Sequence, residues 1–176
     1  MFLGIDPSLT GTGIILLDKD GRIIEERLIK SKSRGKEVIP ELERMLDIID
    51  DIFNCAMFFS DIDIVCIEGL AFMARNTSAL VQLGYLNYKI REKLYNRDIK
   101  FYIIAPTSLK KYACGKGNAK KDLVLLDVYK RWNVSFDDDN LADAFVLAKI
   151  ASALNNEPAD ITQKQLEVLK KIKQLT

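Results

Sequence analysis

The spacing of apolar residues changes after about residue 30, and this change limits the folds that the chain can adopt. Before it, short apolar runs alternate with turn-forming residues, which predicts three strands of an antiparallel meander at 2–6, 14–17 and 22–29. After it, apolar residues recur at steps of three and four, which predicts a core-facing helix of about five turns. The residues with this spacing are Leu42, Met45, Leu46, Ile49 and Phe53.

The rest of the chain alternates between strand and helix patterns. Residues 62–67 are nearly all apolar, as expected of a strand that helices cover on both faces. A further strand is expected at 101–104, because Pro106 cannot continue it. Helices are expected at 77–96, 120–132 and 141–154, with a basic loop at 110–117 and a weakly amphipathic tail at 162–173.

The order of these elements predicts an α/β fold. We expect a mixed five-stranded sheet, in which two parallel strands extend a three-stranded antiparallel meander, with helices on both faces. We expect one domain over residues 1–176, of which 158–176 form a helical tail.

The composition excludes several classes of protein. Of the 176 residues, 48% are hydrophobic and 29% are charged, which is typical of a globular protein and not of a disordered one. No apolar run is long enough to span a bilayer, and the first ten residues lack a secretory signal, which favours the cytosol. Cys55, Cys66 and Cys114 are far apart, so we expect buried thiols and neither disulfides nor a thiolate zinc site.

The sequence contains no histidine, which removes imidazole as a general base and as a metal ligand. Any chemistry must use carboxylates, hydroxyls, lysines or backbone amides. Clustered carboxylates suit hard cations such as Mg²⁺. The net charge of +1 says little about partners, because a bound polyanion needs only a local basic surface.

Two acidic residues end strands that should be central in the sheet. Asp6 ends the first strand and Glu68 ends the fourth, each after a strongly apolar run. Sites in open α/β sheets form beyond the carboxyl ends of such strands, so the two carboxylates could be neighbours. The alternative is that each is a solvated residue where a strand meets a loop.

A third group of acidic residues precedes the last long helix. Asp139, Asn140 and Asp143 share a helix face, so this face could contribute two ligands. Residues 137–139 also suit the cap and first turn of the helix, so Asp139 is either a ligand or a cap. Asp143 directly precedes an apolar run and should face the core, where a metal ion could compensate its charge.

Four segments carry a resemblance to a known family. They are L-G-I-D-P-S-L-T-G-T-G, I-E-G-L-A-F-M-A-R-N, A-P-T-S-L-K-K-Y-A-C-G-K-G-N-A-K-K-D-L-V and D-D-N-L-A-D-A. In this order they resemble the RuvC family of Holliday junction resolvases, within the ribonuclease H-like superfamily. The resemblance runs over about residues 2–154. The chain's small size and its richness in lysine, isoleucine and asparagine look like resolvases of phages and prophages of AT-rich Gram-positive bacteria.

The resemblance implies an endodeoxyribonuclease that nicks four-way DNA junctions symmetrically by metal-dependent phosphodiester hydrolysis. It implies Asp6, Glu68 and Asp143 as metal-binding catalytic carboxylates. The family commonly has an acid or a histidine where Asn140 stands, so either Asn140 is a neutral ligand or Asp139 takes that role. We expect two Mg²⁺ ions about 3.5 to 4 Å apart, replaceable by Mn²⁺, and a mechanism that needs no protein base.

The resemblance also implies a DNA-binding surface. Lys110 and Lys121 match family lysines near the scissile phosphate, where they would assist catalysis, and Phe72 matches an aromatic residue that stacks at the junction centre. The other expected DNA contacts are Arg75, Asn76, Lys111, Lys116, Asn118 and Lys120. The alternatives are an ordinary solvated helix start for the lysines and a core position for Phe72.

The expected partner is branched DNA, bound by a homodimer in the cytoplasm of a bacterium or a phage-infected cell, without a membrane. Two symmetric nicks favour a twofold dimer. Apolar residues of the helix at 77–96 could form its interface or pack in the core: Leu80, Leu83, Leu86 and Ile90.

Two other functions remain open. A nuclease of the same fold could act on forks, flaps, replication or packaging intermediates, or RNA–DNA hybrids. The chain could also bind junctions without cleaving them. An actin-like ATPase is disfavoured, because such enzymes need two domains and the D-x-x-x-T-G-T-G hairpin occurs once.

Overall fold

The computed structural model describes residues 1–56, 61–70 and 77–174, and in it five strands form one mixed sheet in the order β3-β2-β1-β4-β5. The strands are β1 (Phe2–Asp6), β2 (Gly11–Leu17), β3 (Ile23–Lys30), β4 (Ile64–Glu68) and β5 (Phe101–Ile104). The first three pair antiparallel, whereas β4 runs parallel to β1 and β5 runs parallel to β4. The predicted meander extended by two parallel strands is confirmed.

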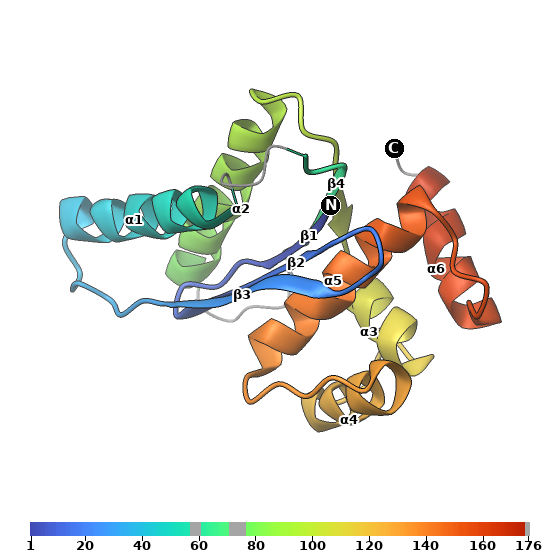
Figure 1. Cartoon of the computed structure of the whole chain (residues 1–176). Helices are drawn as coiled ribbons and strands as arrows, with labels where there is room; N and C mark the ends of the chain where they lie inside the picture. Colours follow the sequence, from blue (N-terminus) through green and yellow to red (C-terminus); the bar gives the residue numbers. More distant parts are fainter. Residues whose placement is uncertain (57–60, 71–76, 175–176) are drawn as a thin grey trace.

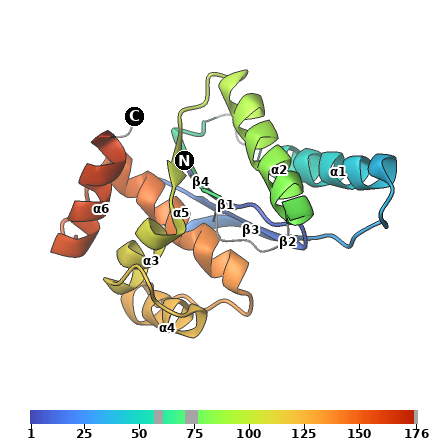
Figure 2. The same cartoon turned by 180° about the vertical axis from the view of Figure 1, so that it is seen from behind.

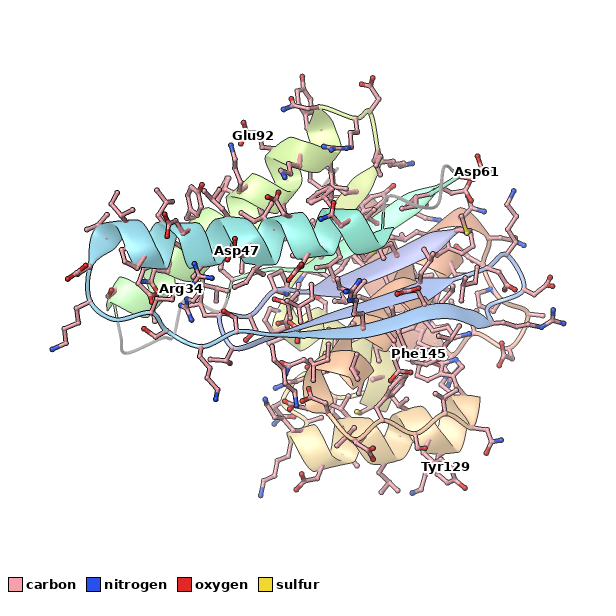
Figure 3. All side chains as sticks on the ribbon, turned by 60° about the vertical axis from the view of Figure 1, so that its left-hand side comes forward. Arg34, Asp47, Asp61, Glu92, Tyr129 and Phe145 are labelled. Atoms are coloured by element: carbon pink, nitrogen blue, oxygen red, sulfur yellow. The ribbon has the colours of Figure 1, made fainter. Side chains whose placement is uncertain are left out.

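Helices cover both faces of this sheet (Figures 1 and 2). The helices are α1 (Val38–Ala56), α2 (Thr77–Tyr95), α3 (Pro106–Cys114), α4 (Lys121–Trp132), α5 (Asp139–Asn155) and α6 (Gln163–Gln174). Apolar residues of α1 and α2 form a core with one face of the sheet, while α5, surrounded by α3, α4 and α6, forms the core of the other. Figure 3 shows Phe145 of α5 between the sheet and α4, where it packs edge-on against Trp132.

The prediction of a loop at 110–117 is wrong. Most of it is α3, which begins at Pro106, where the fixed φ of proline suits the first helical turn. The helix ends at Gly115, whose φ of 73° is left-handed and favours glycine. Leu109 and Tyr112 are buried one turn apart, so the helix has an apolar face among its lysines.

Helix α5 packs so closely on β1 and β2 that its backbone contacts the backbone of both strands. A Cβ atom on Gly4 would lie 1.9 Å from the carbonyl oxygen of Ala144, and one on Gly13 would lie 2.2 Å from that of Asn140. Only glycine allows this approach. The N-terminal half of α5 is thereby held beside the carboxyl end of β1.

Helix α1 is fastened to two loops by a buried ion pair. The guanidinium of Arg44 lies 2.9 Å from the carboxylate of Glu41, and its Nη1 donates to the carbonyl oxygen of Leu9 at 3.0 Å. The Glu41 carboxylate also accepts from Ser33 Oγ at 2.8 Å and from the backbone amide of Arg34. Nearby, Arg34 and Asp47 form an exposed ion pair of 2.5 Å, whose two side chains Figure 3 shows side by side.

Several smaller expectations can be compared with the structure. Leu86 and Ile90 could have formed a dimer interface or packed in the core. Both are fully buried, so the structure shows core packing. Cys66 is buried and Cys114 half-buried, both as free thiols, while the side chain of Cys55 lies outside the described part. Within the described ranges, no helix has the length and apolar character needed to cross a bilayer.

Candidate active site

Three carboxyl groups from three different elements meet at one edge of the sheet. Asp6 is the last residue of β1 and Glu68 the last residue of β4, the parallel strand beside it. Asp143 lies in the first half of α5, which packs on β1. Asp6 is 5% exposed, while Glu68 and Asp143 are half-buried, so all three are withdrawn from bulk water.

Burial raises the pKa values of all three acids, and repulsion by neighbouring carboxylates adds to the rise for Asp6 and Asp143. Burial, followed by the Glu68 charge, raises the pKa of Asp6 well above its usual range, and a hydrogen bond joins the two carboxyl groups. Burial also raises the pKa of Glu68. Burial, followed by the charges of Glu68 and Asp139, raises the pKa of Asp143 to about 7. The site therefore holds more negative charge than it can keep ionised by itself.

Two lysines supply positive charge to this cluster. Lys110 on α3 and Lys121 at the start of α4 both oppose the rise in the pKa values of Glu68 and Asp143. The Lys121 ammonium donates to the Asp139 carboxylate, and this hydrogen bond raises the pKa of Lys121. The fold thus brings both expected lysines to the acids, from helices that follow β5.

At the start of α5, the N-cap and the candidate metal ligand are two different residues. Asp138 is the N-cap: its Oδ1 accepts from the backbone amide of Asn140 at 2.9 Å and from Asn140 Nδ2 at 2.8 Å. Asp139 is the first helical residue, and its charge contributes to the raised pKa of Asp143. Asp138 therefore fills the N-cap position, and Asp139 stands in the first turn of α5.

The acids fit a divalent cation by their chemistry. A cation would offset both the burial and the repulsion that raise the pKa of Asp143, and carboxylate oxygens are the ligands that Mg²⁺ prefers. Between Asp6 and Glu68 a cation would take the place of the shared proton. Within 1–56, 61–70 and 77–174, no three Asp, Glu or Cys residues already stand in an arrangement that would hold a metal ion. Asp6, Glu68 and Asp143 would therefore have to draw closer together to share a cation.

Besides Lys110 and Lys121, the residues expected to bind DNA fall into three groups. Lys116, Asn118 and Lys120 are exposed in the connection between α3 and α4. Lys111 lies 2.8 Å from the carboxylate of Glu167 on α6, so its charge is already paired. The expected contacts Phe72, Arg75 and Asn76 lie outside the described residues.

One residue beside the site was missed by the sequence analysis. The side chain of Asn87 on α2 donates from Nδ2 to the backbone carbonyl oxygen of Glu68 at 2.9 Å. A signal for it exists in the sequence: Asn87 follows Leu83 by four residues and precedes Ile90 by three, so it occupies a core-facing position in an apolar stripe.

Comparison with known families decides where this chain belongs. Residues 2–151 match the family model described as "Crossover junction endodeoxyribonuclease RuvC". The chain belongs to the RuvC family. The curated RuvC of Aliarcobacter butzleri is 30% identical over 152 residues, which cover 83% of this chain and 94% of that protein. The RuvC of Sulfurovum sp. is 30% identical over 125 residues, which cover 69% of this chain and 74% of that protein.

A solved RuvC structure has the same fold. The structure of T. thermophilus RuvC in complex with Holliday junction substrate has a TM-score of 0.69 and 19% sequence identity, and covers 87% of this chain and 93% of that one. The expected ribonuclease H-like fold is confirmed. Membership of the RuvC nuclease family implies a general dependence on divalent metal ions. The family match ends within α5, so α6 lies beyond it.

Proposed function

We propose that this RuvC-family protein is an endodeoxyribonuclease that nicks four-way DNA junctions symmetrically. One observation carries the proposal: Asp6, Glu68 and Asp143 meet beside two lysines at the sheet edge. Clustered acids can hold a cation, and lysines can balance the charge of a phosphate. The relatives' name, crossover junction endodeoxyribonuclease, supports the junction as the substrate.

The side chains of the cluster have different roles in this proposal. Asp6, Glu68 and Asp143 hold the cation, with Asp139 as a fourth carboxylate close to Asp143. When bound, Mg²⁺ supplies an activated water and stabilises the leaving oxygen. We propose two Mg²⁺ ions per site, with Mn²⁺ as a substitute, since both prefer oxygen ligands. Lys121 stabilises the negative charge that grows on the phosphate.

The exposed connection between α3 and α4 is the proposed path of the DNA backbone. Lys116 and Lys120 can each neutralise a phosphate, and Asn118 can donate a hydrogen bond to one. Lys110 assists both binding and chemistry, because it lies near the acids. Lys111 contributes less, since DNA would have to displace Glu167.

We propose that the protein is a homodimer that joins through α2. Val81, Tyr88 and Tyr95 are 73%, 65% and 74% exposed and occur at every seventh position, so they lie along one side of the helix. Large apolar side chains aligned in this way are typical of a binding face, unlike single exposed ones. A second copy is the occupant that the function requires, because two symmetric nicks need two active sites related by a twofold axis. We also propose that the protein acts in the cytoplasm, where chromosomal and phage DNA are found.

The decisive experiment is cleavage of a synthetic four-way junction with and without Mg²⁺. Forks, flaps, linear duplex and an RNA–DNA hybrid of the same sequence are assayed in parallel. We expect paired, symmetric nicks in the junction that require Mg²⁺ or Mn²⁺. Preferential cleavage of forks, flaps or the hybrid would assign the enzyme to that substrate, and binding without cleavage of any of them would contradict a nuclease.

Carboxylate variants connect this activity to the site. Asp6→Asn, Glu68→Gln and Asp143→Asn should each abolish nicking while the protein still binds the junction, because binding depends mostly on lysines. Asp51→Asn is the matched control, since Asp51 is an exposed acid on α1. Near wild-type cleavage by any of the three site variants would remove that residue from the proposed ligands.

A further inference from the structure

Asn87 is a polar residue in the core between α2 and the sheet. It is 1% exposed. Its Nδ2 donates to the carbonyl oxygen of Glu68 at 2.9 Å, whereas its Oδ1 is buried and has no hydrogen-bond partner among the residues that the structure describes. Among the described residues, therefore, only the NH2 group of this amide has a hydrogen-bond partner.

Packing alone does not explain an asparagine at this position. A buried amide oxygen without a partner costs free energy, because it has lost its hydrogen bonds to water. A leucine, which has nearly the same shape, would avoid this cost. The leucine would, however, leave the carbonyl oxygen of Glu68 without its donor.

The hydrogen bond completes a clamp on the peptide group that follows Glu68. The carbonyl oxygen of this peptide accepts from Asn87 on α2, and its N–H group, on Gly69, donates to the carbonyl oxygen of Ile104 at 2.8 Å. Both polar groups of one peptide are therefore held, one by a helix and the other by β5. The clamp lies where β4 ends and its hydrogen bonding to β1 stops.

We infer that Asn87 is a positioning residue for the catalytic carboxylate of Glu68. The clamped peptide is bonded to the Cα atom of Glu68, so its orientation sets the direction in which the side chain leaves the sheet. Hydrogen-bond partners that orient metal-binding residues commonly contribute tenfold to hundredfold to metal affinity or activity. The inference rests on the proposed function for the role of Glu68, but the clamp itself can be tested without DNA.

The first test is hydrogen exchange of the Gly69 amide in the free protein, measured by NMR. In Asn87→Leu we expect this amide to exchange at least fivefold faster than in the wild type, because one half of the clamp is lost. Amides in the middle of α5 should be unchanged. Ile90→Val is the matched control, since Ile90 is buried on the same helix and Asn87 is retained. Unchanged exchange at Gly69 in Asn87→Leu would overturn the inference.

The second test separates positioning from stability. Asn87→Leu removes one unpaired oxygen but leaves the Glu68 carbonyl oxygen without its donor, so its melting temperature should stay close to that of the wild type. Its single-turnover nicking of a junction should nevertheless be tenfold to hundredfold slower, with junction binding unchanged within about twofold. A purely structural role predicts a lower melting temperature instead. Nicking within twofold of wild type would overturn the inference.

A second variant keeps the test available if Asn87→Leu does not fold. Asn87→Ala has a smaller side chain that cannot donate a hydrogen bond to the Glu68 carbonyl oxygen. It should lower both the nicking rate and the melting temperature, and it should speed exchange at Gly69. Wild-type protein that cleaves no DNA would refute the proposed function, while the exchange experiment would still decide the clamp.

Discussion

Lys121 is the residue at which binding and chemistry can be separated most directly. Its exposed ammonium pairs with Asp139, and it opposes the rise in the pKa values of Asp6, Glu68 and Asp143. A phosphate placed over these acids would lie beside it. A lysine there meets charge that grows in the transition state, so it lowers the barrier as well as the dissociation constant.

We predict that Lys121→Ala slows single-turnover nicking about a hundredfold even at saturating enzyme. Lys116→Ala is the matched control, because this exposed lysine should contact only a phosphate of the DNA backbone. That variant should bind more weakly, with a salt slope reduced by about one, and saturation should restore its rate. Full recovery of Lys121→Ala at saturation would reduce Lys121 to a binding residue.

Asp138 and Asp139 are neighbours with different expected roles. Asp138→Ala removes the N-cap of α5, so the free energy of unfolding should fall by about 1 kcal/mol while nicking is retained. Asp139→Ala should lower nicking by orders of magnitude with little change in unfolding. Chemical denaturation and a nicking assay on both variants check the prediction. An active Asp139→Ala would instead favour Asn140 or water as the fourth ligand.

At the scale of elements, the contact between β1 and α5 sets the geometry of the site. We predict that Gly4→Ala lowers the free energy of unfolding by about 3 kcal/mol or more, because its Cβ would lie 1.9 Å from the Ala144 carbonyl oxygen. Gly84→Ala is the control: its Cβ would meet nothing closer than Leu70 at 4.0 Å, and alanine favours the helix by about 1 kcal/mol. Equal unfolding of the two variants would contradict the close packing of α5.

The attachment of α1 should depend on pH through Glu41. Hydrogen bonds from Ser33 and from the Arg34 amide, together with Arg44, lower the pKa of Glu41 below its usual value. A lowered pKa in the folded state means that the carboxylate stabilises the fold fully above the unfolded pKa of about 4.3. This stabilisation is lost as the pH falls through the lower, folded pKa.

We therefore predict that the difference in melting temperature between wild type and Glu41→Gln is largest near neutral pH and shrinks below about pH 4.3. Thermal unfolding between about pH 3 and pH 7 measures it. Glu43→Gln is the control, because Glu43 is an exposed acid on the same helix. A difference that stays constant over this range would show that the charge of Glu41 contributes nothing.

The elements differ in how well the sequence predicts them. Strand ends are predictable because apolar runs stop at Asp6 and Glu68, and parallel neighbours then bring these residues to one edge. Helix α3 is hidden, since the lysines and glycines of its segment mask the spacing of its buried residues. The pairing of Lys121 with Asp139 cannot be predicted locally, because it depends on how α4 and α5 pack. The hydrogen bond from Asn87 to the Glu68 carbonyl depends in the same way on how α2 packs beside β4.

At the scale of the whole molecule, the site lies between two helical layers, one on each face of the sheet, that have different roles. Helix α5 supplies Asp143 and Asp139 from one side of the sheet, and α3 and α4 bring the lysines with it. Helix α2, on the other side, holds the Glu68 peptide with its inner face. The outer side of the same helix carries the exposed stripe of Val81, Tyr88 and Tyr95. A partner bound to that stripe would therefore steady the helix that positions Glu68.

The dimer proposal is tested by placing charge on this stripe. We predict that the double variant Val81→Glu, Tyr88→Glu is monomeric in sedimentation velocity at concentrations where the wild type is dimeric, because carboxylates would have to be buried at the interface. On a cruciform in a supercoiled plasmid, the monomer should produce single nicks where the wild type makes paired ones. Tyr129→Glu is the control, since Tyr129 is 54% exposed on α4 in the other layer (Figure 3). A double variant that remains dimeric, or a Tyr129→Glu protein that dissociates, would move the interface away from α2.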